Sequence, residues 1–416
     1  MSIFAFPVEL VQDVVSYMAK PDILKFAFTC RTAYACAVPS ILRDVSLRKG
    51  TKKEADEHLR SFCICVLADL PRRASHIRSL TIGTPTFADE KGAYSQQDYA
   101  LADHLARIIS LATGLRLLIV LDAERLFCSA PPQLARAIIS LNNLSDIQFE
   151  GYAGPHALGV LSEMRSRPVA VTLTSFGTPT CHRALRTGRD RLLPNFSDTL
   201  VSLTLVNNHD LFQALQSDVV WPTLKHLTIG GVRDAANLPA FARTFPGVRR
   251  LEVYARCTEE TVGPGLWKQL ECVSLDRPVP ICRPVRHIEL VGGDWMEEQF
   301  GLSATMMAGI EPTTVTCRDV DVQAVAQLLG CTHSIRYVRF VRASAHTRQG
   351  FALFGSLSAD SWLEAHNFSA LARAHLLALT IPVDIVRAYI DIDGDWACFR
   401  ARSEVAIGRA GYLRGS

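Results

Sequence analysis

A short hydrophobic pattern recurs along the chain from residue 77 onward. Each copy has an apolar residue, two variable residues, a second apolar residue, one variable residue and a third apolar residue. The copies that begin at Leu200, Leu224 and Val248 lie 24 residues apart, and the next begins 22 residues later at Leu270. Alternating apolar residues predict a strand with one buried face, and a fixed period of this length predicts stacked units with a shared core. The clearest copies begin at Leu200, Leu224, Val248, Leu270, Val285 and Ile335.

The segments between these strands carry helical patterns. Weaker copies of the strand pattern begin at Ile77, Leu115 and Leu144, with others around Val171 and Leu376. Apolar residues at helical spacing occupy 101–109, 134–141 and 322–329. Strand, helix and strand at this period favour an α/β solenoid with a parallel sheet on its concave face and helices on its convex face. Only 15 residues separate Leu270 from Val285, which leaves no room for a full helix, so we expect an irregular array.

The variable positions of each strand pattern point away from the predicted core. Because neighbouring strands stack, these positions form rows across the sheet. Arginine and aromatic side chains in such rows suit recognition of a protein segment, and a solvated polar face without a ligand is an equally compatible interpretation. The candidate target-binding residues are His226, Arg250, Glu252, Tyr254, His287, Glu289, Tyr337 and Arg339.

A different pattern occupies residues 1–47. Pro7 favours the first turn of a helix, and an apolar stripe of Leu10, Val11, Val14, Val15 and Met18 follows at spacings of three and four. The sequence predicts that this helix ends before Pro21, that Asp22 caps a second helix, and that a third helix over 31–38 stops before Pro39. A unit of this size buries little surface alone, so we expect it to need a partner.

Two stretches resemble known families. Residues 1–47 resemble an F-box, in the opening Pro7-x-Glu9-Leu10, the second-helix triplet Asp22-Ile23-Leu24, the pair Cys30-Arg31 followed by Tyr34, and the closing segment 42–47. Residues 77–344 resemble a divergent leucine-rich-repeat array, in which Asn208 stands at the position of the repeat asparagine. The F-box likeness is to the F-box proteins abundant in mushroom-forming fungi.

The resemblance implies a non-catalytic substrate-recognition subunit of a Skp-cullin-F-box E3 ubiquitin ligase. The helical module would bind a Skp-type adaptor, and through it a cullin, while the repeats bind an unknown protein substrate. The alternative is a leucine-rich-repeat scaffold without a ubiquitin-ligase role, whose N-terminal helices only cap the array. The adaptor-binding residues implied by the resemblance are Pro7, Leu10, Val14, Ile23, Leu24, Cys30, Arg31, Tyr34 and Leu42.

These patterns divide the chain into four parts. The F-box-like module at 1–47 is followed by a linker and first helix at 48–76, which opens with the basic cluster 48–53. The repeat array at 77–344 then leads into a last repeat and a polar cap at 345–416. With 416 residues, the chain exceeds the size at which one compact core stops growing, as an elongated array requires.

Composition and motifs exclude several functions. A formal net charge of +3 spread along the chain does not favour nucleic-acid binding. No apolar run is long enough to span a bilayer, and the N-terminus lacks the basic start of a signal peptide, so we expect a cytoplasmic or nuclear protein that does not bind membranes. Twelve scattered cysteines are then small buried hydrophobes.

No motif for catalysis or cofactor binding is found. The chain has no phosphate-binding glycine loop and no nucleophile elbow. Cys272, Cys282 and His287 are the best candidates for a zinc site, but they lack the paired Cys-x-x-Cys spacing that fixes one. We therefore expect no catalytic residues, no metal and no cofactor, and an enzyme with an unrecognised site is the remaining alternative.

Overall fold

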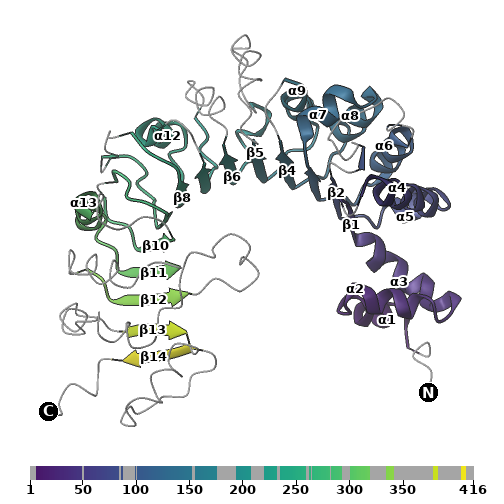
Figure 1. Cartoon of the computed structure of the whole chain (residues 1–416), viewed down its shortest axis with the longest axis horizontal. Helices are drawn as coiled ribbons and strands as arrows, with labels where there is room; N and C mark the ends of the chain where they lie inside the picture. Colours follow the sequence, from purple (N-terminus) through teal and green to yellow (C-terminus); the bar gives the residue numbers. More distant parts are fainter. Residues whose placement is uncertain are drawn as a thin grey trace. The chain divides into compact units, whose positions relative to one another are not determined.

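The structure is a computed structural model of the whole chain. It describes residues 6–48, 51–83, 86–87, 99, 101–151, 155–175, 194–207, 220–231, 235–258, 262–263, 265–281, 283–292, 300–318, 334–341, 378–382 and 404–408. The chain divides into two compact units, Met1–Ser217 (unit 1) and Asp218–Ser416 (unit 2). Both units are α/β, with a parallel sheet and helices between the strands (Figure 1).

Unit 1 begins with three helices and continues as alternating strands and helices. Its elements are α1 (Val8–Ser16), α2 (Lys20–Ala27), α3 (Arg31–Arg43), β1 (Asp44–Leu47), α4 (Lys52–Leu67), α5 (Leu70–Ala74), β2 (Ser79–Ile82), α6 (Ala102–Leu111), β3 (Leu117–Val120), α7 (Ala123–Ser129), α8 (Pro132–Ile139), β4 (Asp146–Glu150), α9 (Pro155–Glu163), β5 (Ala170–Thr174), the 3-10 turn η5 (Pro194–Phe196) and β6 (Ser202–Val206).

The strands of unit 1 pair in parallel in their order along the chain, from β1 to β6. Their second and fourth residues are buried and stand in register, so each strand adds one layer to a continuous ladder. The helices between strands pack on their neighbours along the other side of the ladder (Figure 1). The second-position residues of the ladder are Val45, Leu80, Leu118, Ile147, Val171 and Leu203.

The turns that leave several strands use the left-handed backbone region. Asn207 and Gly151 each follow a strand directly and have φ of 55° and 61°. Asparagine and glycine tolerate this region better than other residues. A Cβ atom on Gly151 would lie 2.8 Å from the Cα of Asp122, so the close approach of successive turns also requires glycine there.

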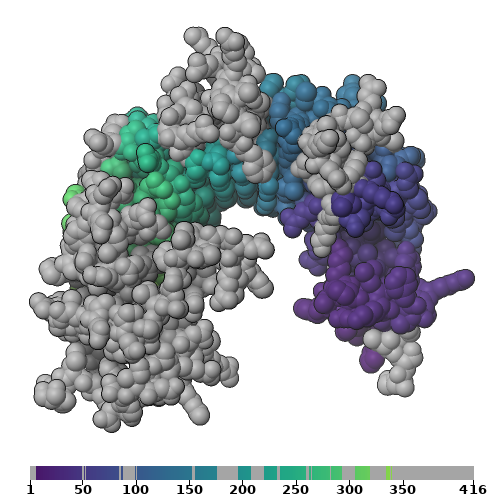
Figure 2. Space-filling view, in the orientation of Figure 1, coloured from purple at the N-terminus to yellow at the C-terminus, as the bar shows by residue number. Residues whose placement is uncertain are grey.

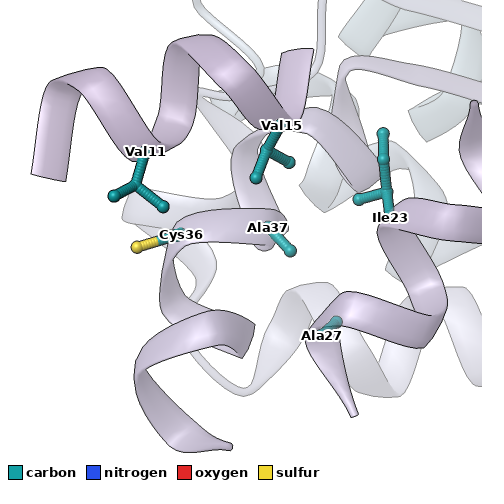
Figure 3. Close-up of a cluster of buried hydrophobic side chains, with 6 residues drawn as sticks. All are labelled: Val11, Val15, Ile23, Ala27, Cys36 and Ala37. Atoms are coloured by element: carbon teal, nitrogen blue, oxygen red, sulfur yellow. The ribbon is translucent and has the colours of Figure 1, made fainter. Parts of the chain in front are cut away.

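The three N-terminal helices form a small module with its own core (residues 8–43, the N-terminal module). Figure 3 shows this core, in which α1 and α2 pack against α3. Met18, Phe26 and Ile41 pack around it. The fully buried members of the core are Val11, Val15, Ile23, Ala27, Cys36 and Ala37.

Unit 2 continues the same arrangement with fewer described helices. Strands β7 to β13 pair in parallel in chain order, and β14 pairs antiparallel to β13. Its elements are β7 (His226–Gly230), α12 (Leu238–Thr244), β8 (Arg250–Tyr254), β9 (Cys272–Leu275), β10 (His287–Val291), α13 (Phe300–Ile310), β11 (Thr314–Arg318), β12 (Tyr337–Val341), β13 (Ala378–Pro382) and β14 (Glu404–Gly408).

Aromatic side chains fill the core of unit 2 next to α12. The rings of Trp221 and Phe245 meet edge to face at 6.0 Å, and Phe241 stacks on Phe245 at 6.2 Å. Trp267 is buried and donates its indole N–H to the carbonyl oxygen of Phe245 at 2.9 Å. This hydrogen bond satisfies a polar group that burial would otherwise penalise.

Most of the predicted strands and the helices at 101–109 and 134–141 are confirmed. The helix expected within 48–76 is α4, which begins directly after Thr51, where Thr51 and Glu54 form a capping box. The sheet begins at Asp44 rather than at residue 77. Asn208, Cys282, the predicted helix at 322–329 and nearly all of 345–416 lie outside the described residues.

Two predictions about the N-terminal helices are also wrong. Helix α3 continues through Pro39, because burial of Leu42 beyond it offsets part of the proline's cost of about 3 kcal/mol. Asp22 does not cap α2, since that helix already begins at Lys20 after the extended Ala19. Pro21 fits there because the first turn needs no backbone N–H. Asp22 instead pairs with Lys25 at 3.2 Å.

Candidate functional site

Helix α1 carries apolar side chains on two adjacent faces. Val15 lies in the core of the N-terminal module with 1% of its surface exposed, whereas Val14 beside it is 55% exposed. Val11 and Leu10 repeat this division one turn earlier, with Val11 buried and Leu10 exposed. The helix therefore has a second apolar stripe that its own module does not cover, since residues four apart lie on one face.

The exposed stripe belongs to a larger surface on the N-terminal module. Eight of the thirteen large apolar side chains that are exposed in the described residues fall within residues 6–34, and the other five are scattered over the rest. Figure 2 shows the module in purple, and in Figure 1 its helices α1 and α2 lie on the side away from β2. A concentration of this kind marks an interaction site. We call it the N-terminal apolar surface: Phe6, Val8, Leu10, Val14, Tyr17, Leu24, Phe28 and Tyr34.

The predicted adaptor-binding residues divide between this surface and the core. Leu10, Val14, Leu24 and Tyr34 lie on the N-terminal apolar surface. Pro7, Cys30 and Arg31 are exposed beside them, and the Cys30 sulfur accepts a hydrogen bond from the backbone N–H of Ala33 at the start of α3. Ile23 and Leu42 are buried and stabilise the module from within.

Sequence reasoning missed the most exposed members of the surface. Tyr17 and Phe28 are almost fully exposed at the C-terminal ends of α1 and α2. Tyr17 follows Leu10 and Val14 at helical spacing, and Phe28 follows Leu24 by four residues. The detectable signal was an apolar pattern too wide for one buried face of a short helix.

Side-chain contacts help attach the N-terminal module to the rest of unit 1. The guanidinium carbon of Arg73 on α5 lies 5.9 Å from the centre of the Tyr34 ring. The Lys20 amine donates a 2.8 Å hydrogen bond to the carbonyl oxygen of Asp44 in β1. Tyr34 therefore contacts α5 with its ring while 39% of its surface stays exposed.

A network of charged side chains covers the polar face of β8 to β11 in unit 2. Glu289 on β10 has only 10% of its side chain exposed, and its Oε1 atom accepts from Arg318 Nη2 at 2.6 Å and from Arg318 Nε at 3.1 Å. Its Oε2 atom lies 3.8 Å from Nη2 of Arg250 on β8. A buried carboxylate needs such pairing, because desolvation of an unpaired charge costs several kcal/mol, on the order of 3–5.

Glu252 on β8 extends the network toward β7. Its Oε1 atom accepts from Arg250 Nε at 2.8 Å, and its Oε2 atom accepts from Thr228 Oγ1 at 3.3 Å and from the Tyr254 hydroxyl at 3.5 Å. The Tyr254 hydroxyl also lies 3.2 Å from Ser274 Oγ. We call this set the charged network: Thr228, Arg250, Glu252, Tyr254, Ser274, Glu289 and Arg318.

The electrostatics of the charged network keep Arg250 charged and Tyr254 protonated. Burial alone would lower the pKa of Arg250, but the nearby groups, chiefly Glu252 and also Glu289, offset this effect and raise it. Burial and the same two carboxylates raise the pKa of Tyr254. Each of these groups therefore keeps its hydrogen-bond donor at neutral pH.

The remaining predicted residues lie in the same rows of the sheet. His287 lies 3.0 Å from Thr316 Oγ1 through its Nε2 atom, and burial lowers its pKa. His226, Tyr337 and Arg339 are exposed on β7 and β12. Arg318 was missed because the sequence pattern gave no strand at β11, which pairs with both β10 and β12.

The described side chains on this face of the sheet give little support for catalysis or metal binding. Burial raises the pKa of Cys272, which disfavours the thiolate that nucleophilic chemistry needs. Among the described residues, no group of three or more metal-ligating side chains comes together. None of the helices in the described ranges combines the length and apolar character that a bilayer crossing requires.

A scan against protein-family models finds no match for the chain, and a search of curated proteins finds none either. What each surface binds is therefore inferred from its own residues.

Proposed function

We propose that this chain is a non-catalytic substrate-recognition subunit of a Skp-cullin-F-box ubiquitin ligase. In this proposal the N-terminal module is an F-box that binds a Skp-type adaptor, and the polar face of the repeats binds the target protein. The parallel strands at a period of 22 to 24 residues would be leucine-rich repeats. Assembly of this kind would place the chain in the cytoplasm or the nucleus.

The observation that carries the proposal is the N-terminal apolar surface. The N-terminal module consists of three helices, and its core buries one apolar stripe of α1. The second stripe, with Leu10, Val14 and Tyr17, remains exposed together with Leu24 and Phe28. Burial of exposed apolar side chains contributes about 1.5–3 kcal/mol each, so a partner that covers this surface gains substantial binding energy. Aromatic residues such as Tyr17 are typical anchors of protein interfaces.

A binding experiment with purified components tests the proposal. The full chain and a Skp-type adaptor are mixed, and the affinity is measured by calorimetry for wild type and for two variants. Leu10→Asp places a charge in the apolar surface, whereas Leu111→Asp makes the same change at an exposed leucine on α6. We expect wild type and Leu111→Asp to bind alike and Leu10→Asp to bind at least 100-fold more weakly, on the order of 3 kcal/mol.

Two results would overturn the proposal. The first is no association between the wild-type chain and the adaptor at micromolar concentration. The second is equal affinity for Leu10→Asp and Leu111→Asp, which would show that the apolar surface does not contact the adaptor. Thermal unfolding of both variants provides the control, because each substitution lies at an exposed position and should leave the melting temperature nearly unchanged.

Deletion of the N-terminal module tests whether its helices dock an adaptor or only cap the repeat array. Because β1 belongs to the sheet, the deletion must end at residue 43 rather than after it. If the helices only cap the array, the deletion exposes the core of the first layer and the remaining chain loses cooperative unfolding. A docking module leaves a folded repeat array that no longer binds the adaptor.

A further inference from the structure

Two arginines from distant strands converge on one buried carboxylate in unit 2. Arg250 stands on β8 and Arg318 on β11, three strands away, which corresponds to about 14 Å across a sheet. Their guanidinium groups nevertheless both reach Glu289, at 3.8 Å and 2.6 Å. The shared carboxylate therefore holds two positive groups close together at the surface.

The most exposed hydrogen-bonding groups of the charged ion pairs in this network are donors. Glu252 is partly buried and uses both of its oxygens within the network, and Glu289 is almost wholly buried. Arg250 and Arg318 are 47% and 49% exposed. Among the described residues, neither Nη1 atom of these two arginines has a hydrogen-bond partner. A guanidinium carries five N–H donors and no acceptor, so both present free donors to a ligand.

The surroundings of these donors also favour an anion. In the described part of the sheet, Arg339 on β12 stands in the same row as Glu289, and Asp276 after β9 is paired with Arg277 at 3.0 Å. His287 adds no positive charge at neutral pH, because burial lowers its pKa. An incoming carboxylate therefore meets the exposed guanidinium groups of Arg250 and Arg318, whereas an ammonium group meets carboxylates that are more buried and already paired.

We propose that the charged network is the target-binding site and that it recognises acidic side chains of an extended protein segment, with a carboxylate held by Arg250 and Arg318. This inference rests on the proposed function, whose target it defines as an acidic segment. The arginine forks match carboxylate geometry, and their attachment to Glu252 and Glu289 fixes them before the ligand arrives. Binding to prearranged groups loses less side-chain entropy than binding to free ones. The exposed ring of Tyr337 offers an apolar contact two strands from Glu289.

Fluorescence anisotropy with defined peptides tests this site. The probe is a fluorescein-labelled peptide of four Ser-Glu repeats, and its Ser-Gln and Ser-Lys counterparts differ only in charge. Alternate residues of an extended peptide face the same side, so every glutamate can face the sheet. We expect the full chain to bind the Ser-Glu peptide at least tenfold more tightly than the Ser-Gln peptide at low salt, and the Ser-Lys peptide more weakly still.

Matched variants locate the binding. Arg250→Gln and Arg318→Gln remove one guanidinium each, and Arg243→Gln removes an exposed arginine from α12, outside the polar face. We expect each of the first two to weaken binding of the Ser-Glu peptide at least tenfold and Arg243→Gln to leave it unchanged. Thermal unfolding of each variant is measured as well, because Arg318→Gln leaves Glu289 less well paired and could destabilise the fold. If Arg318→Gln does not fold, the peptide affinity of Arg250→Gln alone tests the site.

The outcomes are distinct. Equal binding of Ser-Glu and Ser-Gln peptides by wild type, tighter binding of the Ser-Lys peptide, or unchanged binding after Arg250→Gln would each overturn the assignment. Adaptor affinity is measured on the same proteins. If the adaptor binds all variants alike while peptide binding follows Arg250, the site assignment stands on its own. If the adaptor does not bind wild type, the proposed ligase role fails whatever the peptides show.

Discussion

Replacing Val14 or Val15 with alanine tests whether α1 has one buried and one exposed apolar face. Val15→Ala removes two buried methyl groups, which costs about 1.6 kcal/mol at about 0.8 kcal/mol per carbon. The cavity that remains adds about 1 kcal/mol, so the N-terminal module should lose roughly 2 to 3 kcal/mol of its stability. Val14→Ala removes the same atoms from an exposed position, and it should change stability by less than about 0.5 kcal/mol.

The two substitutions should separate in binding as well as in stability. Amide hydrogen exchange in α1 to α3 measures the stability of the module itself, because a melting curve of the whole chain includes the repeat array. Val14→Ala should weaken adaptor binding by up to about tenfold, since the two methyl groups are covered only in the complex. If both variants lose equal protection, or if Val14→Ala binds the adaptor like wild type, the assignment of an inner and an outer face to α1 is incorrect.

Three further predictions concern protonation and helix capping. Burial raises the pKa of Cys63 to about 11, so iodoacetamide at pH 8 should modify the exposed Cys30 and Cys128 and spare Cys63 in the folded chain, as peptide mass mapping would show. Burial lowers the pKa of His287 from 6.5, so the unfolded chain takes up a proton first as the pH falls through 6.5. Stability should therefore fall below that pH until the folded pKa is reached, and His287→Gln should reduce the loss in pH-dependent denaturation. Thr51→Ala removes the capping box of α4 and should cost about 1 kcal/mol, measured by chemical denaturation against wild type.

The strand ladder could be predicted because it depends on two local features. Each strand needs two buried residues at alternate positions, and each layer needs enough chain to return to the start of the next strand. Leu203 with Leu205 and Leu227 with Ile229 satisfy the first condition, and their 24-residue separation satisfies the second. Neither condition involves distant parts of the chain, so both can be recognised in the sequence.

Strand β11 escaped prediction because the first position of its pattern does not match. Val315 and Cys317 are buried as the pattern requires, but a proline stands at 312, where the other copies have their first aliphatic residue. The buried Ile310 at the end of α13 occupies the core just before this strand. Without β11, Arg318 has no assigned position, and its ion pair with Glu289 could not be inferred from the sequence.

The two faces of α1 were not separable by periodicity either. Leu10 with Val14 and Val11 with Val15 have the same spacing of four residues. Only the packing of α1 against Cys36 and Ala37 of α3 decides which pair is buried. The F-box resemblance indicated that this region contacts a partner, but the division between core and surface depends on tertiary structure, as Ile23 and Leu42 also show.

The junction between the N-terminal module and the sheet bears on how docking would affect unit 1. Helix α3 ends at Arg43 and β1 begins at Asp44, so no flexible residue separates the module from the first strand. The carbonyl oxygen of Arg43 accepts a hydrogen bond from the backbone N–H of Arg78 at 2.9 Å, and Lys20 holds the carbonyl oxygen of Asp44. Both ends of this connection are therefore fixed to neighbouring elements. A partner bound to α1 and α2 would therefore be held in a fixed orientation relative to β1, because the connection leaves little freedom for the module to rotate.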